Sequence, residues 1–161
     1  MNRNLLGILI GVLGVLTVTC IGGAVFASWW LSNNTGPPRN VTITSAIPAG
    51  IRAGSEFEIT ITVADTSGKA RVVKDIDFHG TLLDGVTVVS VTPMHAAYDP
   101  AQGYHTYTMD APVPANGTKT IVFRLLADTP GTYAGDLDVS VDGIMRIHTM
   151  PTVYTIDPRQ P

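Results

Sequence analysis

The sequence predicts an all-β protein, an antiparallel Greek-key β-sandwich of seven or eight strands, preceded by one N-terminal transmembrane helix. Three observations lead to this prediction. Residues 5–31 contain no Asp, Glu, Lys, Arg or His; apolar and polar residues alternate through much of 40–161; and turn-forming residues recur between the alternating stretches. The first pattern is typical of a membrane span, and the other two are typical of short antiparallel strands. The expected parts are therefore residues 1–31 (cytoplasmic N-terminus and span), 32–39 (linker) and 40–161 (extracytoplasmic sandwich).

The apolar run 5–31 is long enough to cross a bilayer. As a helix it would extend for about 40 Å, against about 30 Å of hydrocarbon. Trp29 and Trp30 at its end suit the outer membrane interface. Arg3 precedes the run and the next charge is Arg39, so the positive-inside rule places the N-terminus in the cytoplasm and the domain in the periplasm or at the cell surface.

Two other interpretations of the N-terminus are open, a cleaved secretory signal and a lipidated cysteine. Small residues before a cut after Ala27 suit signal peptidase, but the apolar run exceeds the 7–15 residues of a signal core. Cys20 lacks the flanking residues of a lipidation motif, because Thr17 stands three residues before it. A retained signal anchor is favoured, with Cys20, the chain's single cysteine, as a small apolar residue of the span.

Glycines in the apolar run suggest a helix contact. Gly7, Gly11 and Gly14 fall near one stripe of a helix, and such a stripe lets a second backbone approach closely. The alternative is that glycine is simply common in membrane helices. The stripe favours packing against other membrane-protein subunits.

The stretch after the span changes from linker to strand patterns. Pro37 and Pro38 give residues 32–39 the composition of a short, semi-rigid stalk. Period-two alternation then predicts half-buried strands. Their expected ranges are 41–46, 57–63, 71–78, 86–91, 104–109, 118–126, 132–141 and 144–156.

Turn signals separate these ranges, among them Asp84-Gly85, Asn116-Gly117, Pro130-Gly131 and Asp142-Gly143. Pro151 is expected to divide the last range or to place it at a sheet edge. The alternation also predicts core residues, namely Phe57, Ile59, Ile61, Val86, Val88, Phe123, Tyr133 and Val139.

Two long segments carry a family resemblance. PAGIRAGSEFEITITV and PANGTKTIVFRLLADTPGTYAGDLDVSV resemble the immunoglobulin-like domains of bacterial and archaeal surface proteins, in which a glycine turn leads into an alternating strand. The resemblance covers most of residues 40–142 and implies an immunoglobulin-like sandwich used for spacing or binding. This chain differs from the surface repeats because it has one copy behind an N-terminal span.

Charge and motifs exclude several function classes. Nine Lys and Arg and thirteen acidic residues follow the span, a net charge of −4, which disfavours nucleic acid as a partner. The sequence contains no G-x-S-x-G, S-x-x-K, H-E-x-x-H, P-loop or dinucleotide fingerprint. We therefore expect a protein without enzymatic activity and without a cofactor.

Histidine and methionine form the first candidate metal constellation. Met94-His95, His105 with Met109, and His148-x-Met150 combine imidazole with thioether, which suits copper. His148 and Met150 would share one face of a strand. Ordinary half-buried strand residues are the simpler interpretation, since no Cys ligand accompanies them.

Paired carboxylates form the second candidate. Asp75 and Asp77, and Asp136 and Asp138, each share a strand face, with Asp142 beyond the second pair. Oxygen ligands in this arrangement suit calcium, although a solvated acidic face is the favoured interpretation because the other features of an EF-hand loop are missing. Sequons for N-glycosylation begin at Asn33, Asn40 and Asn116.

These observations favour a non-enzymatic accessory or structural subunit. It would be anchored in the lipid bilayer by one span and would dock on a larger membrane complex through an outer sandwich. The alternatives are an independent surface or adhesion module, a pilin-like filament subunit, and a copper-handling domain.

Overall fold

The computed structural model describes residues 36–101, 103–143 and 146–159. The predicted span 5–31, with Cys20, the glycine stripe and both tryptophans, lies outside the described residues, as does Asn33. In the described part of the chain, no helix is long and apolar enough to cross a membrane.

The described residues form two β-sheets of ten strands in all, which confirms the all-β part of the predicted fold class. The strands are β1 (Val41–Ala46), β2 (Ile51–Arg52), β3 (Glu56–Asp65), β4 (Arg71–His79), β5 (Val86–Thr92), β6 (Ala97–Asp99), β7 (Tyr104–Val113), β8 (Thr118–Ala127), β9 (Gly131–Val141) and β10 (Ile147–Asp157). The short strands β2 and β6 were not predicted. With two or three residues each, they are too short to show a period-two pattern.

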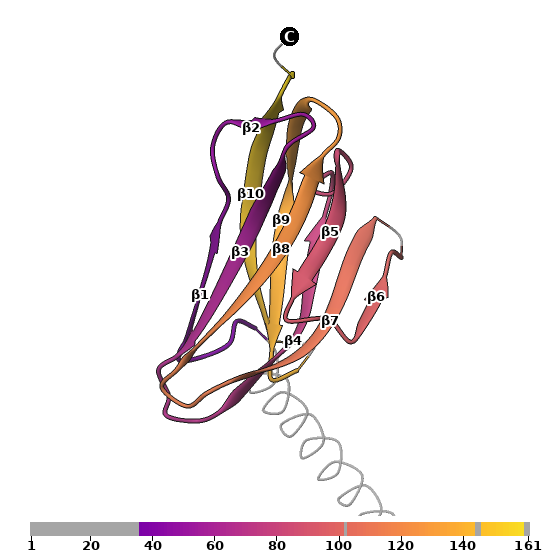
Figure 1. Cartoon of the computed structure of the whole chain (residues 1–161). Helices are drawn as coiled ribbons and strands as arrows, with labels where there is room; N and C mark the ends of the chain where they lie inside the picture. Colours follow the sequence, from indigo (N-terminus) through magenta and orange to yellow (C-terminus); the bar gives the residue numbers. More distant parts are fainter. Residues whose placement is uncertain (1–35, 102, 144–145, 160–161) are drawn as a thin grey trace, which may run out of the picture. The chain divides into compact units, whose positions relative to one another are not determined.

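The strands form two sheets that pack face to face (Figure 1). The four-stranded sheet has the order β1-β3-β8-β5, and the six-stranded sheet has the order β2-β10-β9-β4-β7-β6. All pairings are antiparallel except β2 with β10. The first order is that of strands A, B, E and D in one sheet of an immunoglobulin constant domain. Here the hairpin β6–β7 follows β5 along the chain and extends the other sheet.

The core lies between the sheets and follows the predicted alternation closely. Along β3, Phe57, Ile59, Ile61 and Val63 are buried while the intervening residues are more exposed. Phe123, Tyr133 and Val139 are also buried, as predicted. Val86 and Val88 are only half-buried, because they border an open pocket at the edge of the sandwich.

Pro151 occupies a sheet edge, one of the two predicted outcomes. Strand β10 continues through Pro151, which faces Asp136 of β9. The partner on the other side, β2, pairs only with Ile156 and Asp157. Proline lacks an N–H group, so it is tolerated where no neighbouring strand needs a donor.

A tyrosine fixes the turn between β8 and β9. The Tyr133 hydroxyl donates a hydrogen bond to the Thr129 carbonyl oxygen at 2.8 Å. Immunoglobulin-type sandwiches carry a similar tyrosine bond at the start of strand F. Gly85 lies directly under the ring, since a Cβ atom at Gly85 would stand 1.9 Å from Tyr133 Cζ.

A buried carboxylate joins the turns at the other end of the sandwich. Asp65 accepts hydrogen bonds from the Ser67 hydroxyl at 2.6 Å and the Asn116 backbone N–H at 3.0 Å. These bonds hold the pKa of the Asp65 carboxyl far below its ordinary value. Arg71 contacts both Asp65, at 3.3 Å, and Asp142, at 2.6 Å. Asp142 therefore forms an ion pair with Arg71 and does not join the acidic pairs with which the sequence analysis grouped it.

Candidate functional site

The two sheets have unequal widths, and this leaves part of one inner face uncovered. The four-stranded sheet ends at β5, whereas β7 and β6 extend the six-stranded sheet by two strands beyond β4. In Figure 1 the β6–β7 hairpin projects beyond β5. The inner side chains of this hairpin have no complete second sheet above them, and Tyr98 is accordingly 44% exposed.

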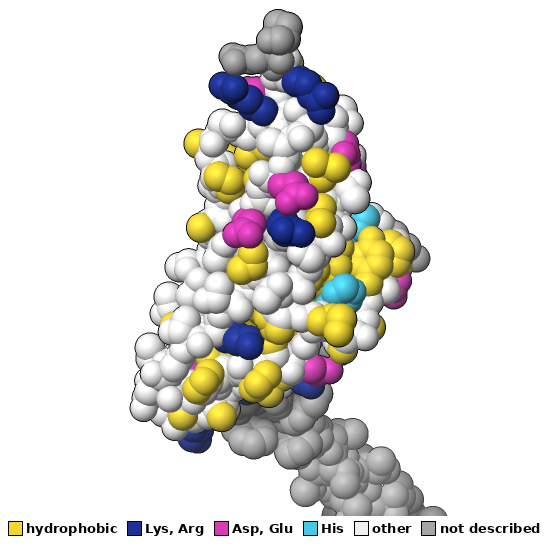
Figure 2. Space-filling view, in the orientation of Figure 1, with side chains coloured by type: hydrophobic (Ala, Val, Ile, Leu, Met, Phe, Trp, Pro, Cys, Tyr) yellow, Lys and Arg dark blue, Asp and Glu magenta, His cyan; other side chains and the backbone are white. Residues whose placement is uncertain are grey.

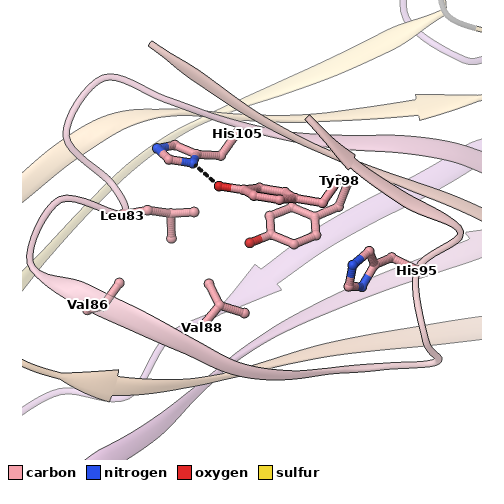
Figure 3. Close-up of a pocket in the computed structure, with 7 residues that line it drawn as sticks. Leu83, Val86, Val88, His95, Tyr98 and His105 are labelled. Atoms are coloured by element: carbon pink, nitrogen blue, oxygen red, sulfur yellow. Dashed lines mark hydrogen bonds between the residues drawn. The ribbon is translucent and has the colours of Figure 1, made fainter. Parts of the chain in front are cut away.

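A pocket of about 340 Å³ lies at this seam. We call it the seam pocket; it is lined by Leu83, Val86, Val88, His95, Tyr98, His105 and Tyr107. Figure 3 shows Tyr98 and His105 facing the aliphatic Leu83, Val86 and Val88. The pocket therefore has one aliphatic side, from β5 and the turn before it, and one aromatic side, from β6 and β7.

Hydrogen bonding and ring contacts order the aromatic side. The Tyr98 hydroxyl and His105 Nδ1 are 2.8 Å apart, and their rings are stacked at 13°. The Tyr98 ring also lies 4.7 Å from that of Tyr107, which contacts Phe123 in the core at 5.0 Å. Burial raises the pKa of the Tyr107 phenol to about 12, so Tyr107 presents a neutral ring and hydroxyl at neutral pH.

His95 lies in the connection between β5 and β6. Its ring stands nearly perpendicular to that of Tyr107, with centroids 5.2 Å apart. Its Nδ1 atom is buried and has no hydrogen-bond partner among the described residues. A buried polar atom without a partner carries a free-energy cost, so His95 Nδ1 is suited to a hydrogen bond with a ligand.

The structure brings together only some of the copper candidates. His95 and His105 both line the seam pocket, while Met94 is 84% exposed and Met109 is buried in the core. His148 and Met150 lie on β10, opposite Val139 and Leu137 of β9. Strands β9 and β4 lie between β10 and β7, so His148 and Met150 are not brought together with the pocket histidines.

One residue of each acidic pair meets the other, on the outer face of the six-stranded sheet. Asp77 lies opposite Asp138 on β9, and burial raises the pKa of the Asp77 carboxyl above its ordinary value. Thr106 donates a hydrogen bond to Asp77, and His79 Nε2 lies 3.1 Å from Asp138 Oδ2. Across residues 36–101, 103–143 and 146–159, no group of three or more His, Cys, Asp or Glu is arranged to hold a metal ion.

The sequence indicated little of the seam pocket. His95 and His105 were singled out as copper candidates, and Val86 and Val88 as core residues. Tyr98, His105 and Tyr107 were not selected as a group, because β6 is too short to show alternation and nothing in the sequence pairs it with β7. The available signal was the alternation of His105 and Tyr107, which share one face of β7 and lead into the alternately buried end of that strand.

Comparison with known proteins shows resemblance of fold alone. No family model and no curated protein matches the chain. A cohesin module of a Clostridium perfringens family 33 glycoside hydrolase has a TM-score of 0.48 at 10% identity, covering 74% of this chain and 98% of its own. The cupredoxin domain of amoB from Nitrosocaldus yellowstonii gives 0.47 at 11%, covering 75% and 89%. The ASH / PapD-like domain of human CEP192 gives 0.36 at 15%, covering 73% and 86%.

Proposed function

We propose that this protein is a non-enzymatic binding module, held at the membrane by its N-terminal segment, that docks on a larger membrane complex through the seam pocket. The observation that carries the proposal is the uncovered inner face of the β6–β7 hairpin. There Tyr98 is 44% exposed beside a pocket of about 340 Å³. Exposed aromatic side chains next to a concave apolar surface are typical of binding sites.

The same face has further features of an interface. Figure 2 shows an apolar area flanked by histidine side chains where the β6–β7 hairpin lies in Figure 1. Met94, 84% exposed, stands next to His95 at this edge, and methionine adapts its shape to varied partners. A partner that covered Met94 and Tyr98 would remove apolar surface from water and complete the incomplete side of the sandwich.

Two finer parts of the proposal come from the sequence. The immunoglobulin-like character rests on the resemblance of the strand and turn segments and is supported by the strand order β1-β3-β8-β5. The membrane anchor rests on the apolar run 5–31. A non-enzymatic role is supported by the absence of nucleophile and phosphate-binding motifs from the sequence.

Site-specific photo-cross-linking tests the docking surface. The variant Met94→p-benzoylphenylalanine, expressed at native level, should form a discrete cross-linked product in membranes. The matched control is Val153→p-benzoylphenylalanine, because Val153 is 66% exposed on β10, away from the seam pocket. The product at position 94 should disappear when Tyr98→Leu is added. Equal products at both positions, or a product that survives Tyr98→Leu, would refute docking through the seam pocket.

A second experiment separates a complex subunit from a tethered module. Gly11→Ile keeps the run apolar but adds bulk to the glycine stripe, so close helix packing should be lost. If the span itself packs against the complex, Gly11→Ile should reduce co-purification in mild detergent while the position 94 cross-link persists. Unchanged co-purification would favour the tethered surface module, with recognition confined to the sandwich.

A further inference from the structure

The free edge of β1 differs from the other edges of the two sheets. Strand β1 is the last strand of the four-stranded sheet, and among the described strands only β3 pairs with it. Its six residues pair with β3 without a register shift, and they include no proline and no charged side chain. In Figure 1 β1 lies at the outer margin of this sheet. A regular, uncharged edge strand is a template for pairing with another strand.

The other edges carry features that oppose such pairing. Strand β5 has a register shift between Val88 and Ser90, which marks a bulge. Strand β6 has three residues. On the remaining side, β10 contains Pro151, and the end of β10 is already paired with β2. Natural sheets use bulges, prolines and short strands to keep an edge from pairing, so β1 is the edge that is open to a partner.

The open side of β1 presents the backbone groups of alternate residues. The Thr66 N–H donates a hydrogen bond to the Asn40 carbonyl at 2.9 Å, so Asn40 and every second residue after it face β3. The N–H and C=O groups of Val41, Ile43 and Ser45 therefore point away from β3. None of these groups forms a hydrogen bond with another described residue.

These outward groups are complementary to a second copy of the same strand. Two antiparallel β1 strands related by a two-fold axis at Ile43 place Ile43 opposite Ile43 of the second copy, and Val41 opposite Ser45. Each of these is a hydrogen-bonded pair, so every outward N–H and C=O group of both strands gains a partner. On the outer face, the exposed Thr42 lies opposite Thr44 of the second copy, and cross-strand threonine pairs are favourable. No like charges meet, because β1 carries none.

We propose that the protein forms a two-fold symmetric dimer in which the β1 strands of two copies pair edge to edge about Ile43. The pairing joins the two four-stranded sheets into one. This register uses all the outward groups of β1, so the dimer is closed and adds no third copy. The seam pocket borders β5, at the opposite edge of the four-stranded sheet. The dimer therefore presents two seam pockets, and its formation does not depend on the docking proposed for them.

Disulfide cross-linking of the full-length protein in membranes tests the register. In a Cys20→Ala background, one copy carries Thr42→Cys and a second copy, with a tag of different mass, carries Thr44→Cys. Directly opposite residues of a non-hydrogen-bonded pair have Cα atoms about 4.5 Å apart, a distance that a disulfide can span. Identical positions in the two copies stand about 8 Å apart in this register, beyond the limit of about 7 Å for a disulfide.

Mild oxidation of the co-expressed copies should give roughly tenfold more product between the two tags than between copies with the same tag. The control pair is Thr118→Cys with Thr120→Cys, because both residues are exposed on the same face of the sheet, on β8, which β3 separates from β1. This control pair should give only the low yield of chance collisions. Association through the N-terminal segments alone would not favour the combination of positions 42 and 44.

Ser45→Pro tests the backbone pairing itself. Proline at this position removes an outward N–H group and keeps the groups that face β3, so the pairing of β1 with β3 is retained. The variant should lower the cross-link between positions 42 and 44 to the yield of the control pair, while near-UV circular dichroism shows a folded protein. Ser45→Ala keeps the N–H group and should keep the cross-link.

Three results would overturn the dimer. The first is a yield between the two tags no higher than that of the control pair at positions 118 and 120. The second is a cross-link between positions 42 and 44 that survives Ser45→Pro. The third is a product whose mass differs from that of two copies, which would assign the β1 edge to a strand of another protein.

Discussion

The tyrosine at the start of β9 provides the sharpest test of the fold. Its hydroxyl donates to the Thr129 carbonyl at 2.8 Å, and its ring lies against Gly85. Gly85 also accepts backbone hydrogen bonds from Asp128 and Thr129, at 2.9 and 3.1 Å. The turn between β8 and β9, the turn before β5 and the Tyr133 ring therefore form one packed corner.

Tyr133→Phe removes the hydroxyl and keeps the ring. We expect a loss of about 1 kcal/mol in the free energy of unfolding, rising toward 3 kcal/mol if the Thr129 carbonyl is left without a donor. For a domain of this size, 1 kcal/mol corresponds to a fall in Tm of roughly 4 °C. Gly85→Ala adds a methyl group where the ring already lies, and such overpacking costs about 1–3 kcal/mol.

A double-mutant cycle measures the contact between the two positions. Thermal unfolding of the full-length protein, followed by near-UV circular dichroism, gives each Tm. Gly85→Ala should cost much less in a Tyr133→Leu background, because the smaller side chain leaves space for the methyl group, with a coupling of about 0.5–3 kcal/mol. Additive effects would show that the ring does not lie over Gly85 and would refute the packing of this corner.

Three further predictions concern stability and processing. Because the pKa of Asp65 is lowered in the folded state, its contribution to stability is present above its ordinary pKa of about 4 and is lost as the pH falls below that value. The Tm difference between wild type and Asp65→Asn, measured from pH 7 to pH 2, should therefore shrink on acidification. A constant Tm difference would contradict this role. Copper or calcium titration should leave the Tm nearly unchanged, since tight binding would add about 2.7 kcal/mol at a hundredfold excess over Kd; a saturable rise abolished by His148→Ala would instead establish a copper site. Intact-mass measurement of the native protein should show residues 1–31 still attached, and a mature N-terminus at Ser28 or Cys20 would show cleavage.

Long strands could be predicted from sequence because their side chains meet different surroundings on the two faces. Along β3, Ile59 and Ile61 are buried between the sheets while Glu58 is exposed, so the alternation of residue types follows directly from which face each side chain occupies. The position of Pro151 at a sheet edge follows from its missing N–H group. Each of these inferences needs only the chemistry of one residue or the alternation of apolar and polar residues around it.

The candidate site could not be predicted in the same way, because it depends on where one sheet stops. Val86 and Val88 alternate like core residues, yet they are half-buried since no strand lies beyond β5. Tyr98 reaches the pocket through a three-residue strand whose partner is set by tertiary pairing with β7. The outer face of the six-stranded sheet was easier to predict. There Asp77 lies opposite Asp138, which agrees with the acidic face expected from the sequence.

The seam pocket as a docking site is tested most directly by the amount of partner that co-purifies with the full-length protein from native membranes. Tyr98→Leu should reduce the retained partner about 30-fold or more, the effect of losing an interface tyrosine that contributes at least 2 kcal/mol. Tyr104→Leu, equally exposed on the opposite face, should retain the partner at the wild-type level. Retention of the partner by Tyr98→Leu at the level of Tyr104→Leu would contradict docking through the seam pocket.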